Sequence, residues 1–384
     1  MRILVVNRWT DAFASYGRHI DHQLHHVAYV TVPGWEAPPD ARHVVVLPDL
    51  NKVDSVVQAA RRCAAELGGV DRVLAFSEAD LLTGGLIRDV LGVPGLGRHD
   101  LQRFRDKPAM KAEIAAAGLA VPAFQIVGSA DEVAAFATRT TADVIVKPRA
   151  GMGSWGTQVI PKGQAVPVAE FDDVEVEEFV TGPIWHVDGV VRHGSLSFVK
   201  PSRYIGTCYD FHRGQPLASL TESGPEAEEM VRFTELCLKA LDLTDGLFHL
   251  EIIAAPTGPV FLEVGARVGG GPTPDLFLDE YGIDLVEEWI KIELGLPVSL
   301  PREHAGHVGY LELPGTPGAE VAKVTSLLGK IPGLYFERLS APGHVFTGSP
   351  DVDIAATYHF RGTSPALVRQ AIEASLPLAR VSLR

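Results

Sequence analysis

The sequence predicts a mixed α/β protein in which a small parallel sheet precedes a larger, mainly antiparallel part. Over residues 1–103, short apolar runs alternate with amphipathic stretches, which is the pattern of βαβ units. From about residue 189 onward, apolar runs follow one another at turn spacing, which favours antiparallel strands. Between these parts lies a glycine-rich segment, 151–156, flanked by strand-like runs. A chain of 384 residues is long enough for two or three such units.

Composition and charge exclude several classes of protein. Hydrophobic residues make up 46% and charged residues 21%, a balance typical of globular domains. The net charge of −14 gives no electrostatic support for nucleic-acid binding. Cys63, Cys208 and Cys237 lie far apart, so we expect neither a disulfide framework nor a zinc pair, and a reducing compartment is favoured. The first apolar run, Ile3–Val6, is too short for a signal peptide or a membrane span, so a cytoplasmic protein without membrane contact is expected.

The first unit, over residues 1–103, is expected to present loops at one edge of its sheet. Open parallel sheets bind ligands at the carboxyl ends of their strands. Glu78 comes two residues after an expected strand, and we take it as a candidate substrate contact. The expected strands are Ile3–Val6, Val27–Val32, His43–Leu47 and Val73–Phe76, and the expected helices are Ser55–Leu67 and Thr83–Leu91.

The second unit, over residues 104–185, carries the glycine-rich segment. A helix is expected to open at Lys107-Pro108, because proline suits the first helical turn, and to end near Gly118. The other expected elements are strands at Phe124–Val127, Val144–Val146, Gln158–Ile160 and Val174–Val180, and a capped helix at Ser129–Ala137.

The third unit, over residues 186–384, is expected to be mainly antiparallel. No motif is recognised in its last part, residues 300–384, where strands and one helix are expected. The expected elements are strands at Val190–Val191 and Leu196–Val199, a polar loop from Tyr204 to Ser223, a helix at Glu226–Leu241, a hairpin within Phe248–Arg267, and helices at Leu285–Leu294 and Pro365–Glu373.

The glycine-rich segment matches G-x-G-x-x-G through Gly151, Gly153 and Gly156, with Ser154 inside it. A dinucleotide fingerprint needs a helix after the glycines, whereas Thr157 and the residues after it are strand-like. We therefore expect a glycine loop between two antiparallel strands, which can fold over the phosphates of a nucleotide with its backbone N–H groups. An ordinary flexible hairpin is the alternative.

Two lysines favour the nucleotide interpretation of this loop. Lys147 ends the strand before the glycines, whereas protein kinases place their lysine after them, and no kinase H-R-D or D-F-G motif is present. Lys107 precedes the helix that opens the second unit. A single lysine is usually a solvated surface group, but this pair suggests contacts to the α- and β-phosphates.

The hairpin within 248–267 holds one carboxylate in each apolar strand, Glu251 and Glu263. Two carboxylates about 4 Å apart repel by roughly 4 kcal/mol at an effective dielectric of 20, so they must share a proton, face apart or share a cation. A regular two- or four-residue loop at 256–259 would put them on opposite faces, whereas an odd loop or a bulge would make them face each other. In the second case they suit Mg²⁺, and Arg267 on the same face could stabilise an oxyanion or a phosphoryl group.

Two further clusters carry less information. Glu177 and Glu178 close a strand and lead through Phe179-Val180 to a turn, which suits an adenine-edge hinge or simply a solvated strand end. The histidines His19, His22, His25 and His26 are interpreted as the surface of an amphipathic helix in preference to a metal site.

Together these pieces resemble the ATP-grasp superfamily. The order is a lysine before a helix, a strand lysine with a glycine loop, an E-E-F-V hinge and an E…E-x-x-x-R hairpin. The phrases R-D-K-P-A-M-K and F-H-L-E are similar to those of its carboxylate–amine ligases, and the second is similar to the amino-acid and dipeptide ligase branch. The resemblance covers about residues 1–300. It implies an N-terminal Rossmann-like pre-ATP-grasp domain followed by a two-lobed ATP-grasp fold with a glycine-loop lid.

The resemblance also implies roles for individual residues. Lys107 and Lys147 would hold phosphates under the lid at Gly151–Gly156, Glu177 or Glu178 would meet the adenine amino group, and the Phe179–Val180 backbone would meet the ring edge. Glu251 and Glu263 would bind one or two Mg²⁺, for which Mn²⁺ could substitute. Arg203, or Lys200 in its place, would lie near the γ-phosphate. Arg267 and the loop Gly269, Gly270 and Gly271 would hold the carboxylate and acyl phosphate, and His249 is a further candidate substrate contact.

Two positions depart from the family pattern. Relatives usually place Asn two residues after the second glutamate as a further metal ligand, where this chain has Gly265. Relatives often have an acidic ribose partner near position 184, which is Ile184, so we assign that role to Asp188.

The implied reaction is amide formation. A substrate carboxylate attacks the γ-phosphorus of Mg-ATP, and a small-molecule amine then displaces phosphate from the acyl phosphate. A different nucleophile, as in purine-pathway ligases or carboxylases, and a non-catalytic nucleotide-binding protein are the alternatives. A homodimer is compatible with the sequence.

Overall fold

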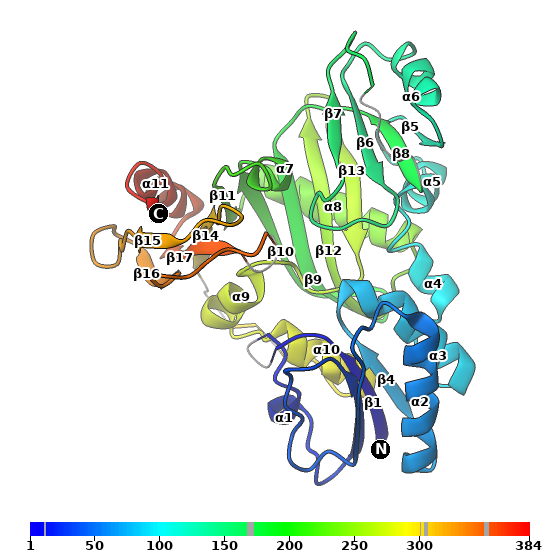
Figure 1. Cartoon of the computed structure of the whole chain (residues 1–384). Coiled ribbons are helices and arrows are strands. Elements are labelled where there is room, and N and C mark those ends of the chain that lie inside the picture. Colours follow the sequence, from blue (N-terminus) through cyan, green and yellow to red (C-terminus); the bar gives the residue numbers. More distant parts are fainter. Residues whose placement is uncertain (11–12, 167–172, 300, 303–305, 349–352) are drawn as a thin grey trace.

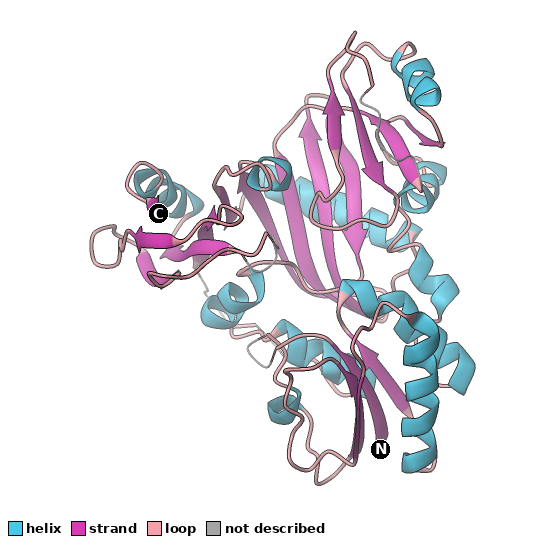
Figure 2. Ribbon diagram, viewed as in Figure 1, coloured by secondary structure: helices cyan, strands magenta, loops and turns pink. Residues whose placement is uncertain are grey.

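The computed structural model describes residues 1–10, 13–166, 173–299, 301–302, 306–348 and 353–384, and three larger sheets organise them (Figure 1). The mixed α/β class predicted from sequence is confirmed (Figure 2). Within the described residues, no helix is both long and apolar enough to cross a membrane.

The N-terminal sheet is parallel, as the βαβ pattern predicts, with strand order β3-β2-β1-β4. Residues 3–6, 27–30 and 73–75 of three of its strands are apolar and buried, whereas the edge strand β3 exposes Val44 and Val46. A short 3-10 turn, Glu78–Asp80, follows β4 and begins α3. The elements are β1 (Arg2–Asn7), α1 (Tyr16–His19), β2 (His26–Thr31), β3 (His43–Val46), α2 (Val53–Leu67), β4 (Arg72–Ala75), α3 (Leu81–Leu91) and α4 (Arg98–Gln102).

A second, four-stranded antiparallel sheet has the order β5-β8-β6-β7 and holds the glycine loop between β6 and β7. The loop therefore joins two antiparallel strands, as predicted, and not a strand and a helix. The helix α5 begins at Lys107, where Asp106 accepts a hydrogen bond from the Ala109 N–H. The elements are α5 (Lys107–Ala116), β5 (Phe124–Val127), α6 (Ala130–Ala137), β6 (Val144–Pro148), β7 (Gln158–Ile160) and β8 (Val174–Glu178).

The largest sheet has eight strands in the order β13-β12-β9-β10-β11-β14-β17-β16, with antiparallel pairing between neighbours. Its strands are β9 (Ile184–Arg192), β10 (Ser195–Ile205), β11 (Leu217–Thr221), β12 (Gly246–Ala255), β13 (Gly258–Gly265), β14 (His307–Pro314), β16 (Leu334–Leu339) and β17 (Ile354–Gly362). The remaining elements are α7 (Cys208–Phe211), α8 (Pro225–Ala240), α9 (Thr273–Tyr281), α10 (Leu285–Leu294), α11 (Pro365–Ser375), and the pair β15 (Val321–Val324) and β18 (Val381–Leu383).

Opposite faces of this sheet carry different partners. On one face, α8 packs on β9, β10 and β13 over an apolar core that includes Trp185, Phe248 and Phe261. The other face bears a polar row and continues into the core shared with α9, α10 and the N-terminal sheet. Phe76, at the end of β4, stacks on Trp289 of α10 with ring centroids 4.1 Å apart. This contact fixes the carboxyl edge of the N-terminal sheet beside the polar face.

Several elements were not predicted from the sequence, among them the short helices α1 and α4. The segment 204–223, expected as a polar loop, contains α7 and the buried strand β11, whose five residues were too short a run to recognise. Helix α9 was missed because its first turn follows the glycines at 269–271 and holds a proline. The unit limits at residues 103 and 185 stay a prediction.

Candidate functional site

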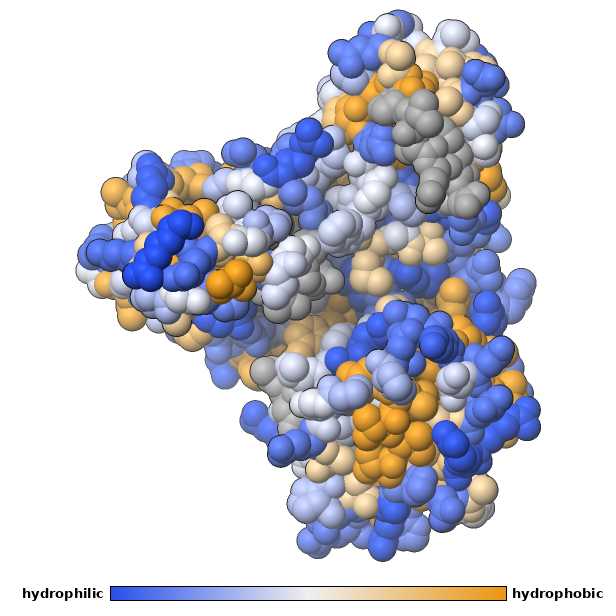
Figure 3. Space-filling model, in the orientation of Figure 1, coloured by the Kyte–Doolittle hydropathy of each residue, from blue (hydrophilic) through white to orange (hydrophobic). Residues whose placement is uncertain are grey.

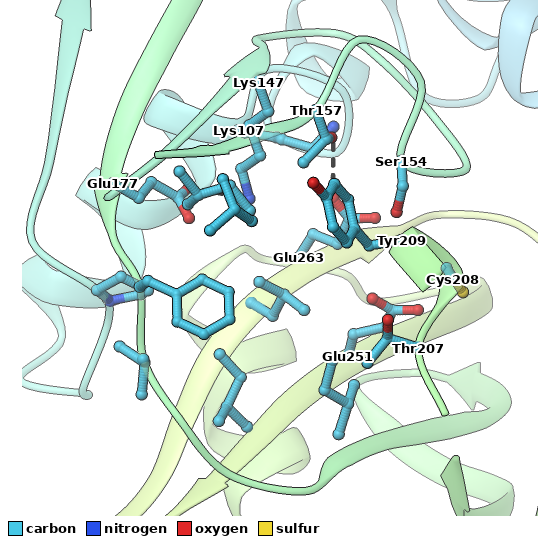
Figure 4. A pocket seen from close by; sticks show the side chains of 18 of the residues that line it. Lys107, Lys147, Ser154, Thr157, Glu177, Thr207, Cys208, Tyr209, Glu251 and Glu263 are labelled. Atoms are coloured by element: carbon cyan, nitrogen blue, oxygen red, sulfur yellow. Dashed lines mark ion pairs between the residues drawn. The ribbon is translucent and has the colours of Figure 1, made fainter. Parts of the chain in front are cut away.

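A cavity of about 440 Å³ lies between the glycine loop and the polar face of the large sheet (Figure 4). In the same orientation as Figure 1, the space-filling surface is hollowed between the upper and lower parts of the molecule (Figure 3). A cavity of this size suits a nucleotide-sized ligand. The predicted site residues that line it are Lys107, Lys147, Gly151, Gly153, Ser154, Glu177, Glu178, Phe179, Val180, Glu251 and Glu263.

The two hairpin carboxylates face each other. The turn has only two residues, so a regular register would pair Glu251 with Leu262. A bulge between the paired positions leaves Leu262 without a partner and brings Glu263 opposite Glu251. The bulge alternative, left open by the sequence, is therefore the one found in the structure.

Cations beside Glu263 keep its carboxylate charged. Burial alone would raise its pKa, but Lys107 and Lys147 outweigh this effect and lower the pKa to about 2. The Lys107 Nζ lies 3.3 Å from Glu263 Oε2 and donates to the Gly151 carbonyl at 2.6 Å. Glu251 lies 3.3 Å from the Tyr204 hydroxyl and 3.5 Å from His249 Nε2. Two facing carboxylates with lysines at the rim are a donor set that fits Mg²⁺ and the phosphates it carries.

A buried charge network supports Lys147, and sequence reasoning missed two of its members. Lys111 and Glu175 are both fully buried, with Lys111 Nζ 2.7 Å from Glu175 Oε1. Lys111 also contacts Glu177, which lies 3.0 Å from the Lys147 Nζ. The signal was available, because Lys111 follows Lys107 by one helical turn and Glu175 alternates with Glu177 along β8.

This network separates the two hinge glutamates. Glu177 is 1% exposed and held by two lysines, so its carboxylate is committed to them. Glu178 is partly exposed, and its nearest polar contact is the Thr140 hydroxyl at 3.4 Å. The Phe179 N–H donates to the Asp143 carbonyl, whereas the Val180 N–H has no partner among the described residues. Glu178 and the Val180 N–H are thus free to bind a ligand in the cavity.

Two neighbouring residues of the glycine loop adopt left-handed backbone conformations. Gly153 and Ser154 both have positive φ, 58° and 61°, which is uncommon for serine. Trp155 at the loop tip is 52% exposed and lies 5.6 Å from the ring of His212. Gly156 lies outside the cavity lining and packs against Pro148, where a Cβ would come within 2.9 Å.

A second group of predicted residues gathers beside the cavity around Arg267. Glu78 accepts hydrogen bonds from both Arg267 and Arg105, so it joins the N-terminal sheet to the two later parts of the chain. A Cβ at Gly265 would lie 3.1 Å from Arg267 Cγ, so a larger residue there would crowd this side chain. Burial alone would lower the pKa of Arg267. The carboxylates of Glu78, Glu263 and Glu251 outweigh this effect and raise it.

The role assigned to Asp188 is not supported. Its side chain is fully buried, and it accepts hydrogen bonds from His186 at 2.5 Å and His249 at 2.8 Å. Burial would raise the pKa of Asp188, but His249 and His186 lower it well below its usual value. For His249 the two effects are reversed. Burial alone would lower its pKa, but Asp188 outweighs this effect and the pKa is raised to about 9. Asp188 therefore orients two histidines under Gly269, where a Cβ would lie 2.3 Å from its Oδ1, and does not reach a ribose.

The placement of Arg203 contradicts its expected role. Side chains alternate along β10, so Arg203 lies on the α8 face, 5.6 Å above the Trp185 ring and 3.2 Å from Glu222. Tyr204, its neighbour, is the residue that lines the cavity. Lys200, the substitute, lies on the polar face 4.1 Å over the Tyr281 ring, outside the cavity lining.

Residues of the α7 segment complete the cavity wall and were missed. Thr207, Cys208, Tyr209 and Asp210 line it opposite the glycine loop. Burial raises the pKa of the Cys208 thiol far above its usual value, which disfavours its reactive thiolate form. Nothing in their spacing marks these residues, because they come from a segment expected to be a loop.

The four histidines do not form one cluster. Helix α1 ends at His19, which lies 3.4 Å from Asp284 and 4.0 Å from Glu287. His22 is buried, 2.6 Å from the Tyr29 hydroxyl. The expected amphipathic helix through these positions is wrong.

Comparison with known proteins gives several sequence relatives, although no family model matches. The chain is 26% identical to an L-arginine-specific L-amino acid ligase of Bacillus subtilis, over 71% of this chain and 70% of that one. It is 25% identical to dapdiamide A synthase of Enterobacter agglomerans, over 53% of this chain and 52% of that one. It is 33% identical to mouse carnosine synthase 1, but the match covers 35% of this chain and 16% of that enzyme.

Solved structures share the fold over the whole chain. An L-amino acid ligase from Bacillus licheniformis superposes with a TM-score of 0.79 at 15% identity, covering 100% of this chain and 98% of that one. Phosphoribosylglycinamide synthetase from Anaerococcus prevotii gives a TM-score of 0.71 at 15% identity, with 100% and 99% covered.

Proposed function

Since the chain is an ATP-dependent carboxylate–amine ligase with the ATP-grasp fold, we propose that it joins an amino acid, through its carboxylate, to an amine in a peptide-like bond. The observation that carries this proposal is the cross-strand pair of Glu251 and Glu263 facing Lys107 and Lys147 in one cavity. Among the alternatives, a protein that only binds a nucleotide would not need the further group around Arg267 and Glu78 beside the cavity.

We infer that the cavity receives ATP with its phosphates toward the hairpin. Glu178 and the Val180 N–H would meet the adenine edge, and Lys107, Lys147 and the glycine-loop N–H groups would hold the phosphates. Mg²⁺ held by Glu251 and Glu263 would neutralise phosphate charge. Gly265 offers no third ligand, so water would complete the coordination of Mg²⁺. The proposal covers the binding of either one or two ions.

The chain's own residues then position the acid. Arg267 would supply positive charge to the acyl phosphate. The N–H groups of Gly269, Gly270 and Gly271 donate to no described residue and would supply hydrogen bonds to it. The carboxylate attacks the γ-phosphorus, giving the acyl phosphate and ADP. An amine attacks the acyl carbon, and phosphate leaves. The glycine loop excludes water from the acyl phosphate.

The identity of the substrates rests on similarity to amino acid ligases. The named relatives are an L-arginine-specific L-amino acid ligase, dapdiamide A synthase and carnosine synthase 1, so amino acids are the first compounds to test on both sides. The cytoplasmic location, homodimeric assembly and replacement of Mg²⁺ by Mn²⁺ are parts of the same proposal.

The decisive experiment is a screen of amino-acid pairs with Mg-ATP, measuring ADP release and detecting products by mass spectrometry. We expect ADP formation that needs both an acid and an amine, with a product mass equal to the sum of the two minus water. Stimulation by bicarbonate or phosphoribosylamine, with no amino-acid pair active, would overturn the proposal in favour of another ATP-grasp reaction.

A further inference from the structure

The polar face of the large sheet continues beyond the nucleotide cavity. Glu251 of β12 lies opposite His186 of β9. Further along the sheet, Tyr204 of β10 lies opposite Ser219 of β11, which in turn lies opposite Tyr310 of β14. Glu312 lies two residues beyond Tyr310 on β14, so its side chain is on the same face. This part of the chain, after residue 300, has no role in the site described so far.

Glu312 is a buried carboxylate with one oxygen unused. Its residue is 6% exposed, and Oε1 accepts a hydrogen bond from the Thr357 hydroxyl at 3.2 Å. Among the described residues, no group donates to Oε2. Oε2 is not one of the fully enclosed side-chain atoms that lack a partner, so a ligand can reach it and donate a hydrogen bond to it.

The free oxygen of Glu312 lies against the glycine loop of the acyl site. A Cβ built on Gly271 would be 3.4 Å from Glu312 Oε2, whereas a Cβ on Gly270 would meet nothing within 4 Å. The loop begins two residues after Arg267, the group proposed to hold the acyl phosphate. Glu312 therefore lies beside the short loop that follows Arg267 in the chain.

The charges around Glu312 leave it poised near neutral pH. Burial is the main influence and raises its pKa to about 7, with small opposing effects from Thr357 and from Arg338 of β16. The titratable groups that face it on neighbouring elements are Tyr310 of its own strand and Cys208 of α7, whose pKa values the Glu312 charge helps to raise. The cation that acts on Glu312 is Arg338, and it lowers the pKa of the carboxyl less than burial raises it.

From this geometry we propose that Glu312 binds the ammonium group of the amine substrate beside Gly271 and removes the proton that must leave before the amine can attack. The inference rests on the proposed ligase function and names the group that activates its second substrate. A protonated amine has no lone pair, so the second half-reaction needs such a group, and neither Arg267 nor the lysines of the cavity can accept a proton at neutral pH.

The proton and electron count is complete. The ammonium gives one proton to Glu312, and the freed nitrogen lone pair forms the C–N bond to the acyl carbon. The C–O bond to phosphate breaks, and the electron pair leaves with phosphate, which takes the second proton from nitrogen. Glu312 then returns its proton to water.

The test separates the two half-reactions with hydroxylamine, which is largely unprotonated at pH 7 and traps the acyl phosphate as a hydroxamate. Glu312→Gln keeps the shape of the side chain and the acceptor for Thr357 but cannot take a proton. We expect hydroxamate formation from ATP and a panel of amino acids to stay within about twofold of the unaltered protein. Coupling to a protonated amino acid should fall by about 100-fold or more, the range of general-base catalysis.

Two controls and the pH dependence complete the design. Glu373→Gln, an exposed glutamate on α11, should change neither reaction, and Glu312→Asp should restore part of the coupling rate. In the unaltered protein, coupling should rise as Glu312 deprotonates near pH 7, and this inflection should vanish in Glu312→Gln. Equal loss of both half-reactions, or unchanged coupling in Glu312→Gln, would overturn the inference. Failure of the unaltered protein to form any hydroxamate or ADP would instead reject the ligase proposal itself.

Discussion

At the residue scale, the site pairs each buried charge with an opposite one. Glu177 is shared by Lys111 and Lys147, Glu263 lies beside Lys107, and Asp188 holds two histidines. Buried ion pairs of this kind contribute little net stability, but removing one partner leaves an uncompensated charge. The arrangement therefore fixes side-chain positions in a part of the molecule that must receive several more charges with its ligand.

Replacing Glu263 by Gln should abolish turnover while the protein stays folded. The amide keeps the size of the side chain but offers no charge to Mg²⁺, so ADP release should fall at least 100-fold, in the range typical for loss of a transition-state charge contact. Circular dichroism and the thermal midpoint report the fold. Near-normal turnover in Glu263→Gln would mean that the metal assignment is wrong.

The His249–Asp188 pair predicts a pH-dependent stability. Because the pKa of His249 is raised to about 9, its contribution is complete below the unfolded value near 6.5 and is lost as pH rises through 9. The effect is on the order of 3 kcal/mol in the free energy of unfolding. Urea unfolding at several pH values should show this decline, and His249→Gln should remove it. The exposed His193 provides the control, since His193→Gln should leave the slope unchanged.

At the scale of elements, single backbone irregularities decide which side chains meet. The bulge at Leu262 rotates Glu263 onto the face of Glu251, although the two-residue turn alone would separate them. Sequence identified both strands and both glutamates, but the energy of a bulge depends on packing around it and leaves no mark in the local residues. The same limit explains Arg203, because the alternation of β10 could not be assigned to a face before its neighbours were known.

The loop between β13 and α9 gives a direct test of close packing. A Cβ on Gly269 would lie 2.3 Å from Asp188 Oδ1, so Gly269→Ala must displace the buried carboxylate and both histidines. We expect a loss of several kcal/mol in the free energy of unfolding. Gly270→Ala is the matched control, since a Cβ there meets nothing within 4 Å and should leave the thermal midpoint nearly unchanged. Equal effects of the two variants would contradict this account of the loop.

At the scale of the whole molecule, the site depends on contacts between parts that the sequence treats separately. Strand and helix patterns predicted the N-terminal parallel sheet, the glycine-loop sheet and the central hairpin, because hydrophobic period and glycine punctuation are local signals. Glu78 was placed correctly at the end of a parallel strand, but its partners Arg105 and Arg267 come from distant segments. Such long-range pairings follow from how the sheets dock, which no local pattern encodes.

Glu78→Gln tests this coupling between the parts. The variant leaves the guanidinium groups of Arg105 and Arg267 without the carboxylate they share, and loss of one partner of a buried ion pair typically costs about 3–5 kcal/mol. Thermal or urea unfolding should show the loss. Asp71→Asn breaks an ion pair with Arg2 on the surface of the same unit and should change the midpoint little. If both variants behave alike, Glu78 does not hold the parts together.

The bond between Glu78 and Arg267 also has a kinetic consequence. With Arg267 in the role proposed above, any acid that enters must first displace a tethered carboxylate of the protein, which acts as a built-in competitor at high local concentration. A simple monocarboxylate would gain Arg267 as a partner and leave Glu78 with Arg105 alone. A zwitterion can exchange both at once, giving its carboxylate to Arg267 and its ammonium to Glu78. The ion pair between Glu78 and Arg267 would thus favour the binding of amino acids over acids that lack an ammonium group, whatever the side chain of the amino acid.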